Sequence, residues 1–340
     1  MPDGKGGGAG GNGEDRRFRI LALDGGGIKG TYTAAFLARI EEMSGKRIVD
    51  HFDLIAGTST GGIIALGLGL GVSAKDILQF YEEEGPRIFP LMGMPTRLRA
   101  LLRQALRPKH KTTALQAALS EVFGRRVLGE SLTRLVITSY DGSSGDVRLF
   151  KTAHHEKLKE DYQTPAVDVA LATSAAPTYL PAFVGSCGTT LVDGGVWSNC
   201  PAAVAVIEAL TVLKQPRHLV ELLTVGTTEE PLHVSDRRAT GGGVRWVRFA
   251  TDVFLQAQMK AALAHAKLLT DDRLVRITEV VERKRFDLDD PKGIHELKAL
   301  GYKGARHRYE EVSGGFLQEP AAPFIPFRGP RSVSRSGTGA

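Results

Sequence analysis

Residues 52–62 read FDLIAGTSTGG, a short apolar run that passes directly into a glycine-rich turn. The run has the length of a buried β-strand, and Ile63 and Ile64 begin an apolar segment of helical length after the turn. Residues 57–61 fit G-x-S-x-G, the pattern in which a serine hydroxyl projects from a sharp strand-to-helix turn. Gly57 and Gly61 flank the serine because a Cβ would clash in so tight a turn. Ser59 is therefore the candidate nucleophile.

The segments around this turn alternate between strand and helix patterns. A strand is predicted over residues 18–23 and a helix over 32–43, with Gly45 as its stop. Residues 135–139 and 147–151 flank a hairpin signal at 141–145. Further along, the predicted elements are a strand at 190–192, a helix near 202–213 and a strand at 219–225. Val253, Phe254, Ala257, Ala261, Ala264 and Leu268 recur at helical spacing, which predicts a long amphipathic helix packed through them on the core. The pattern indicates an α/β protein with a central, mostly parallel sheet.

A second glycine-rich turn, residues 24–30 (DGGGIKG), follows the first predicted strand. Gly25, Gly27 and Gly30 also satisfy the dinucleotide fingerprint G-x-G-x-x-G. That fingerprint needs an acidic residue at the end of a second strand, and Asp50 has the distance but no strand before it. A P-loop is excluded because no Gly-Lys-Ser/Thr follows. The remaining interpretation is a run of backbone N–H groups suited to an oxyanion, with a non-catalytic nucleotide-binding protein as the alternative.

The serine needs a base, and none of the nine histidines lies in a recognisable motif. Asp193 with His218 follows the usual hydrolase order of acid before histidine. That fold places its nucleophile after several strands, whereas Ser59 follows only two. The other hypothesis is that Asp193, followed by Gly194 and Gly195, takes the proton directly, which requires a partly buried carboxylate with a raised pKa.

Composition limits the classes of protein that fit. The chain has 340 residues, 42% of them hydrophobic and 24% charged, which excludes fibrous and disordered classes for its body. Two cysteines are too few for a disulfide framework and favour a reducing compartment. The longest apolar run, residues 63–70, is far shorter than the roughly 20 residues that span a bilayer. We expect a flexible glycine-rich lead at residues 1–16, one domain at 17–318 and a flexible basic tail at 319–340.

The net charge of +6 is concentrated in one segment, residues 85–120, which holds seven basic residues and no acidic one. Its leucines repeat at helical spacing among the cations, the pattern of a helix that lies on an anionic membrane surface. The membrane-contact candidates are Arg97, Arg99, Arg103 and Arg107. So local a distribution argues against a general affinity for DNA or RNA.

Three ordered blocks resemble the signature of patatin-like phospholipases: residues 24–30, residues 57–62 and the DGG at 193–195. Residues 74–90, 172–179 and 197–201 resemble the segments around them, and the similarity covers about residues 17–230. The resemblance implies a three-layer αβα hydrolase in which Ser59 and Asp193 form a dyad without histidine. The N–H groups of Gly25, Gly26 and Gly27 would form the oxyanion hole. Gly30, Gly57, Gly61, Gly194 and Gly195 would support these motifs.

The activity that this resemblance implies is hydrolysis of fatty acyl esters in membrane phospholipids, without a metal or organic cofactor. Another ester or a thioester is the nearest alternative substrate. Lys29 stands where many members of the family carry arginine and is expected to steer an anionic head group.

Compact bacterial members of the family include anti-phage effectors that stay inactive until a cyclic dinucleotide binds, and this chain is similar to them in length. A cyclic dinucleotide activator is therefore expected, with a homo-oligomer on activation. The cations and one aromatic that could hold it are Arg276, Lys284, Arg285, Lys303, Arg306, Arg308 and Tyr309. The expected location is cytoplasmic, peripheral at the inner membrane when the enzyme is active.

Overall fold

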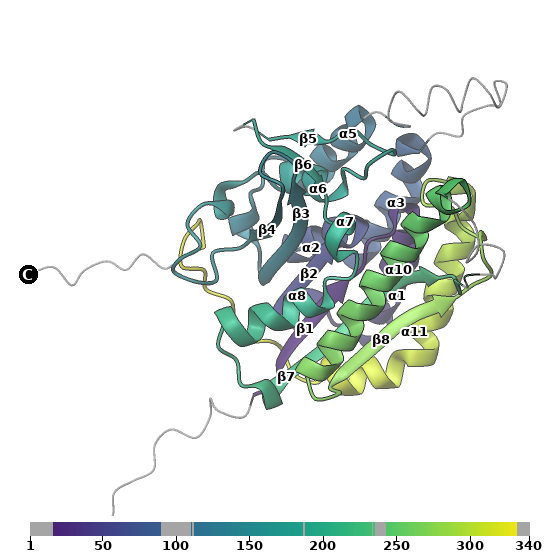
Figure 1. The fold of residues 1–340 in the computed structure, drawn as a ribbon. Helices are drawn as coiled ribbons and strands as arrows, with labels where there is room; N and C mark the ends of the chain where they lie inside the picture. Colours follow the sequence, from purple (N-terminus) through teal and green to yellow (C-terminus); the bar gives the residue numbers. More distant parts are fainter. Residues whose placement is uncertain are drawn as a thin grey trace, which may run out of the picture.

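One mixed sheet with helices on both faces forms the centre of the computed structural model (Figure 1). The structure describes residues 16–89, 110, 112–185, 188–232, 234 and 243–331. Within them, eight strands follow the order β5-β6-β3-β2-β1-β7-β8, with β4 paired to β3. The strands are β1 Phe18–Leu23, β2 Leu54–Thr58, β3 Arg134–Asp141, β4 Asp146–Lys151, β5 Phe183–Val184, β6 Thr190–Asp193, β7 Val220–Glu229 and β8 Leu274–Val280. The pairs among β3, β2, β1, β7 and β8 are parallel, and those of β4, β5 and β6 are antiparallel.

Alternation along the strands divides the core between the two faces of the sheet. Leu21 and Leu23 of β1 belong to the larger cluster, and Ile20 and Ala22 belong to the smaller one. The larger cluster packs against helices α1 Gly30–Ser44, α2 Thr60–Gly69, α3 Ala74–Ile88, α5 Thr112–Phe123, α6 Ala166–Ser174 and α11 Ile294–Phe316. Helices α8 Ala202–Ile207 and α10 Gly243–Leu269 cover the other face. The predicted three-layer αβα architecture with a mostly parallel central sheet is confirmed.

Most of the predicted elements are present with small shifts at their ends. The predicted 18–23 strand, the 141–145 hairpin and the end of the first helix at Gly45 are confirmed, and Gly45 has a φ of 67°. The strand expected from residue 52 begins at Leu54, where its pairing with β1 starts. Helix α8 continues as a π-helix, Glu208–Val212, so the helix near 202–213 is also present.

The apolar stripe of α10 faces solvent, so the prediction that it packs on the core is wrong. Phe254 and Leu268 are each 70% exposed, and the alanines between them in the stripe are exposed as well. The helix packs on the sheet through a different set of residues, among them Met259 and Ala266. Helical spacing identifies apolar stripes, but α10 has two of them, and only the neighbouring elements decide which one is covered.

The first part of the predicted C-terminal tail lies on the body of the protein. The backbone N–H of Ala321 donates to the Asp50 carbonyl at 2.7 Å, and that of Phe327 donates to Ala153 at 2.7 Å. Phe324 is buried, with the Arg134 guanidinium over its ring. The expectation of a loose tail from residue 319 is therefore corrected for residues 319–331, because two backbone bonds and one buried aromatic tie this segment down. Arg97, Arg99, Arg103 and Arg107, the predicted membrane contacts, lie outside the described residues.

Candidate active site

Ser59 lies between the end of β2 and the start of α2 with φ 53° and ψ −123°, a backbone conformation that is rare for a residue with a side chain. Such a conformation costs about 1–3 kcal/mol and persists only where neighbours hold it. The Ser59 N–H donates to Thr173 Oγ1 at 2.9 Å. A Cβ on Gly57 would lie 2.3 Å from the Gly61 carbonyl oxygen. The turn therefore depends on its glycines and on a hydroxyl from α6.

The two glycine-rich turns pack directly against each other. A Cβ on Gly61 would lie 2.2 Å from the Leu23 carbonyl oxygen, and a Cβ on Gly30 would lie 2.1 Å from Thr60 Oγ1. Both distances are far below a normal contact, so no larger residue fits at either position. These glycines bring the end of β1 and the start of α1 against the nucleophile turn.

Strand β3 brings Asp193 to Ser59. One edge of β3 pairs with β4. The other edge pairs with β2 as far as Thr138, which lies opposite Thr58. The same edge then pairs with β6, where Ser139 lies opposite Asp193. Because β6 runs antiparallel, the ends of β2 and β6 meet along this edge. Ser59 Oγ donates to Asp193 Oδ2 at 2.7 Å.

Asp193 is a buried carboxylate, 4% exposed. Its other oxygen, Oδ1, accepts the Gly195 N–H at 2.7 Å. Burial raises the pKa of Asp193 to about 6, although the hydrogen bonds from Ser59 and Gly195 lower it. Gly194 allows this approach because a Cβ there would lie 2.1 Å from Thr138 Oγ1. A carboxylate with this pKa is a better proton acceptor than one in water.

The predicted oxyanion turn has two available donors. The Gly25 N–H donates to the Asn199 carbonyl at 2.9 Å, and that of Ile28 donates to the Leu288 carbonyl at 2.8 Å. The Gly25 N–H is therefore not available to an oxyanion in this conformation, which corrects its prediction as a donor. The N–H groups of Gly26 and Gly27 have no hydrogen-bond partner among the described residues. Gly27 has a φ of 57°, a backbone conformation that favours glycine, so the shape of this turn depends on that residue.

A buried ion pair holds the start of the oxyanion turn. Asp24 is 2% exposed, and its Oδ2 lies 2.6 Å from Arg276 Nη2. Arg276 also donates to Thr224 Oγ1 and Glu229 Oε1, each at 3.0 Å. The carboxylates hold the pKa of this guanidinium above its usual range, although desolvation lowers it. Arg276 therefore anchors the turn, which corrects its prediction as a nucleotide contact.

The other residues predicted to hold a nucleotide do not come together. Lys303 pairs with Glu279 at 3.5 Å, and Arg285 pairs with Glu296. Arg308 pairs with Glu311, and the Tyr309 hydroxyl donates to the Met43 carbonyl at 3.2 Å. The Lys284 N–H donates to Glu230 Oε2, and Arg306 is exposed on α11. The side chains of Arg285, Lys303, Arg308 and Tyr309 therefore have separate partners rather than one shared site.

Two side-chain amides that the sequence did not indicate, those of Asn199 and Gln258, join the site to α10. Asn199 Nδ2 donates to the Gly25 carbonyl at 3.3 Å, so this residue contacts the turn through both side chain and backbone. Gln258 of α10 donates to the Gly195 carbonyl at 2.9 Å and accepts the Asn199 N–H at 3.3 Å. Asn199 lies in the 197–201 block, but neither that block nor the helical spacing around Gln258 indicates these contacts.

Histidine does not contact the dyad within the described residues. The buried rings of His110 and His154 bond to Asp289 and Glu208 respectively. His218 precedes the first residue of β7, which runs parallel to β1 and β2, whereas Ser59 follows the last residue of β2. The two therefore lie at opposite ends of the parallel strands, and the Asp193–His218 alternative does not form. Lys29 is 12% exposed and pairs with Glu230 at 3.0 Å, which corrects its predicted role as a free cation for head groups.

Two features are absent from the described part of the chain. No group of three His, Cys, Asp or Glu side chains in the described part could hold a metal ion. None of the helices found there combines the length and hydropathy that a bilayer span needs.

Known proteins resemble this chain over most of its length. The family model described as patatin-like phospholipase matches residues 21–206. A cGAMP-activated phospholipase of Pseudomonas aeruginosa is 39% identical over 83% of this chain and 82% of the relative. One of Escherichia coli is 33% identical over 91% of this chain and 95% of its own length, and patatin-like protein 1 of Oryza sativa is 32% identical over 90% and 86%. The chain therefore belongs to the patatin-like phospholipases, a family of lipid acyl hydrolases.

Proposed function

We propose that this enzyme cleaves the fatty acyl esters of membrane phospholipids through a Ser59–Asp193 dyad. The observation that supports the proposal is the buried 2.7 Å hydrogen bond from Ser59 Oγ to Asp193 Oδ2. Ser59 Oγ attacks the ester carbonyl carbon while its proton passes to Asp193. The ester C–O bond then breaks, the departing lysolipid oxygen takes that proton, and the acyl group remains on Ser59. In the second step Asp193 takes a proton from water, whose oxygen attacks the acyl carbonyl carbon. The bond from that carbon to Ser59 Oγ then breaks, Oγ takes the proton back from Asp193, and the fatty acid leaves.

The oxyanion of each tetrahedral intermediate is assigned to the N–H groups of Gly26 and Gly27. The residues before these donors are held by the Asp24–Arg276 ion pair and by the bonds of Asn199 to Gly25, and Ile28 after them is held by the Leu288 carbonyl. Because donors fixed in advance need no reorganisation, they stabilise developing charge more than water does. This stabilisation compensates for a base weaker than histidine.

Substitution of either member of the dyad is expected to abolish hydrolysis without unfolding the protein. Ser59→Ala and Asp193→Asn should each lower the release of fatty acid from phospholipid vesicles by a factor on the order of 10⁴ or more. Mass spectrometry of the released acids measures this loss. Ser120→Ala, at an exposed position of α5, is the matched control and should keep full activity. Retained activity in Asp193→Asn would refute the dyad.

The pH dependence follows from the raised pKa of Asp193, about 6. Only the carboxylate can accept the Ser59 proton, so kcat/KM should fall about tenfold for each pH unit below 6. Between the ordinary aspartate value of 3.8 and about 6, the native state keeps a proton that the unfolded chain releases, so the contribution of Asp193 to stability falls as pH rises through this range. Asp193→Asn should therefore raise the melting temperature at pH 8 and by roughly half as much at pH 5. A pH-independent difference in melting temperature would contradict this origin of the pKa.

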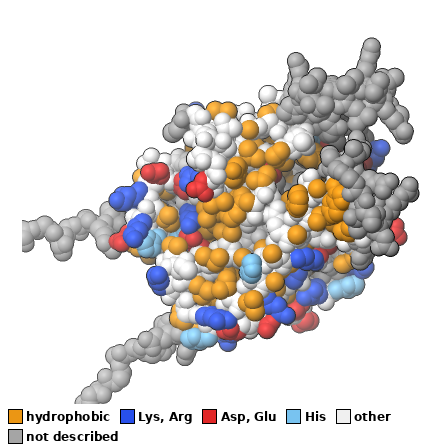
Figure 2. Space-filling model, viewed as in Figure 1, with side chains coloured by type: hydrophobic (Ala, Val, Ile, Leu, Met, Phe, Trp, Pro, Cys, Tyr) orange, Lys and Arg blue, Asp and Glu red, His pale blue; other side chains and the backbone are white. Residues whose placement is uncertain are grey.

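Access to a bilayer is proposed through the face formed by α7 Gly195–Ser198 and α10. Figure 2 shows hydrophobic side chains gathered over both helices on this face. Val196 of α7 is 45% exposed, and Phe254 begins the outward stripe of α10. Gln258 bonds α10 to the Gly195 carbonyl, so the helix that carries the stripe packs beside the proposed catalytic loop. An apolar strip beside the catalytic loop suits an enzyme that draws its substrate from a membrane.

Phe254→Ser tests this face. We expect weaker binding to phospholipid vesicles and slower hydrolysis of vesicle lipid, with unchanged hydrolysis of a soluble short-chain ester. Phe327→Ser, 52% exposed in the C-terminal segment beside Ala153, is the matched control and should bind vesicles normally. A changed oligomeric state with normal vesicle binding would instead identify the stripe as a contact between copies of the chain.

Activation by a cyclic dinucleotide is proposed as well, with assembly into a homo-oligomer on activation and a cytoplasmic, peripheral location. The support is the similarity to bacterial relatives that are cGAMP-activated phospholipases. Hydrolysis should rise at least about tenfold when cGAMP or another cyclic dinucleotide is added to the purified protein. Full activity in the absence of any nucleotide would contradict this regulation.

A further inference from the structure

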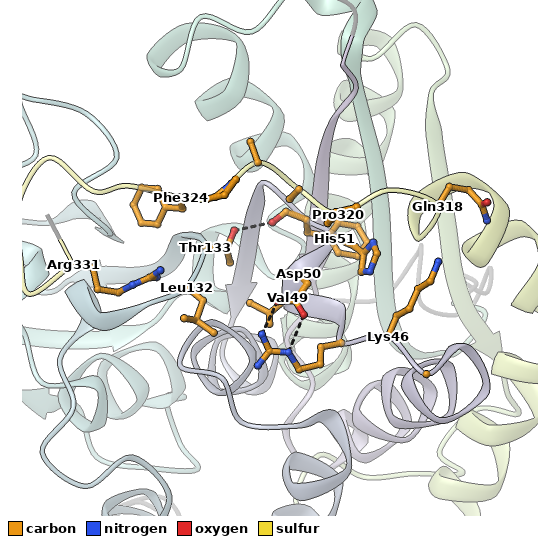
Figure 3. Close-up of a pocket in the computed structure, with 16 residues that line it drawn as sticks. Lys46, Val49, Asp50, His51, Leu132, Thr133, Gln318, Pro320, Phe324 and Arg331 are labelled. Carbon is orange, nitrogen blue, oxygen red and sulfur yellow. Dashed lines mark hydrogen bonds and ion pairs between the residues drawn. The ribbon is translucent and has the colours of Figure 1, made fainter. Parts of the chain in front are cut away.

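A groove of about 700 Å³ lies between the start of the sheet and the C-terminal segment (Figure 3). One wall is formed by residues 45–52, which connect α1 to β2, together with Leu132 and Thr133 before β3. Gln318 and residues 320–324, with Arg331, form the other wall. The volume is within the range of small-molecule sites.

This groove is distant from the dyad. It opens at the first residues of β2 and β3, whereas Ser59 follows the last residue of β2. The five residues of β2 at about 3.3 Å each separate the two places. A molecule in the groove therefore cannot be the substrate, and any effect on hydrolysis would be transmitted through the structure.

Two cations of the groove lack an acidic partner. Arg47 is neutralised by Asp50, which it contacts at 2.8 and 2.6 Å. Lys46 instead donates to the Leu317 carbonyl at 2.6 Å, and Arg331 donates to the Ser131 carbonyl at 2.6 Å. Neither forms an ion pair within the described part of the chain, and each keeps further N–H donors. Figure 3 shows Lys46 and Arg331 at opposite ends of the groove.

The histidine of the groove adds a neutral polar group. His51 Nδ1 lies 2.9 Å from the Glu319 carbonyl oxygen, which can only accept, so Nδ1 carries the proton and Nε2 is an acceptor. Burial lowers the pKa of His51. Two separated cations with an acceptor between the walls match a ligand that carries two phosphates and hydrogen-bond donors.

Two packed helices connect the groove with the oxyanion turn. Helix α1 begins at Gly30, just after that turn, and ends beside Gly45 and Lys46 of the groove. Helix α11 follows Leu288, whose carbonyl accepts the Ile28 N–H, and ends two residues before Gln318. The helices touch closely, since a Cβ on Gly301 of α11 would lie 2.5 Å from the Tyr32 carbonyl oxygen. A shift of either helix end would therefore reach the donors of Gly26 and Gly27.

We propose that this groove is the activating site, in which Lys46 and Arg331 each hold one phosphate of a cyclic dinucleotide. The inference rests on the proposed nucleotide activation and adds its place and its contacts. Binding there draws residues 45–46 and the C-terminal segment together, and α1 and α11 carry the change to the oxyanion turn.

The test compares the wild type with the double variant Lys46→Gln/Arg331→Gln. Calorimetry with cGAMP should show binding weakened at least about tenfold, with activation lost at the concentration that saturates the wild type. Lys75→Gln and Arg328→Gln, both exposed and outside the groove, are matched controls and should bind as the wild type does. Ala322→Trp is a second variant, which fills the groove without removing a contact and should also block binding.

Three results would overturn the proposal, and they differ from one another. Equal binding and activation of the wild type, the double variant and Ala322→Trp would place the nucleotide elsewhere and leave nucleotide activation standing. No response of the wild type to any cyclic dinucleotide would remove nucleotide activation and this site with it. Activation by glycerol 3-phosphate alone, the lipid source of the same phosphate chemistry, would show that the groove serves a head group. Thermal unfolding of each variant verifies that it is folded.

Discussion

The backbone of Ser59 imposes the constraint on which the rest of this structure depends. A residue with a side chain at φ 53° is unfavourable by about 1–3 kcal/mol, and its surroundings must supply that energy. They do so through the glycines at 57 and 61, which let β1 and α2 close on the turn, and through Thr173, which accepts the Ser59 N–H. The strain presents Oγ at the end of the strand, where β6 brings in Asp193.

Burial of charge serves two different purposes within one region. Asp193 is desolvated with a hydroxyl and one N–H as partners, and so its pKa is raised towards the range useful to a base. Asp24 is also buried but forms an ion pair with a guanidinium at 2.6 Å. One carboxylate is therefore placed to exchange a proton, and the other holds the oxyanion turn in place. The distinction arises from the partner and not from the degree of burial.

Two surface features, an apolar stripe and a groove, lie where the packed helices and strands leave residues exposed. Helix α10 packs on the sheet through Met259 and Ala266 and turns a second apolar stripe outward beside the Asp193 loop. At the other end of the sheet, the C-terminal segment docks through Phe324 and encloses a groove with two cations that lack an acidic partner among the described residues. Helices α1 and α11 run between the two glycine-rich turns and the groove, so a packed helix pair connects the Ser59 end of the sheet with a ligand-sized cavity.

Local patterns were sufficient for the central strands, the first helix and the three glycine-rich blocks, because strand alternation, helix stops and tight turns depend on neighbouring residues. The sequence by itself therefore determined the αβα class and named Ser59 and Asp193 as candidates. It could not determine that the Gly25 N–H is occupied by Asn199, that Arg276 pairs with Asp24, or which stripe of α10 is buried. Those outcomes join residues up to 252 positions apart, and only the tertiary structure decided them. The physical reason is that a hydrogen bond, an ion pair or a covered face belongs to two surfaces, and a local pattern describes only one of them.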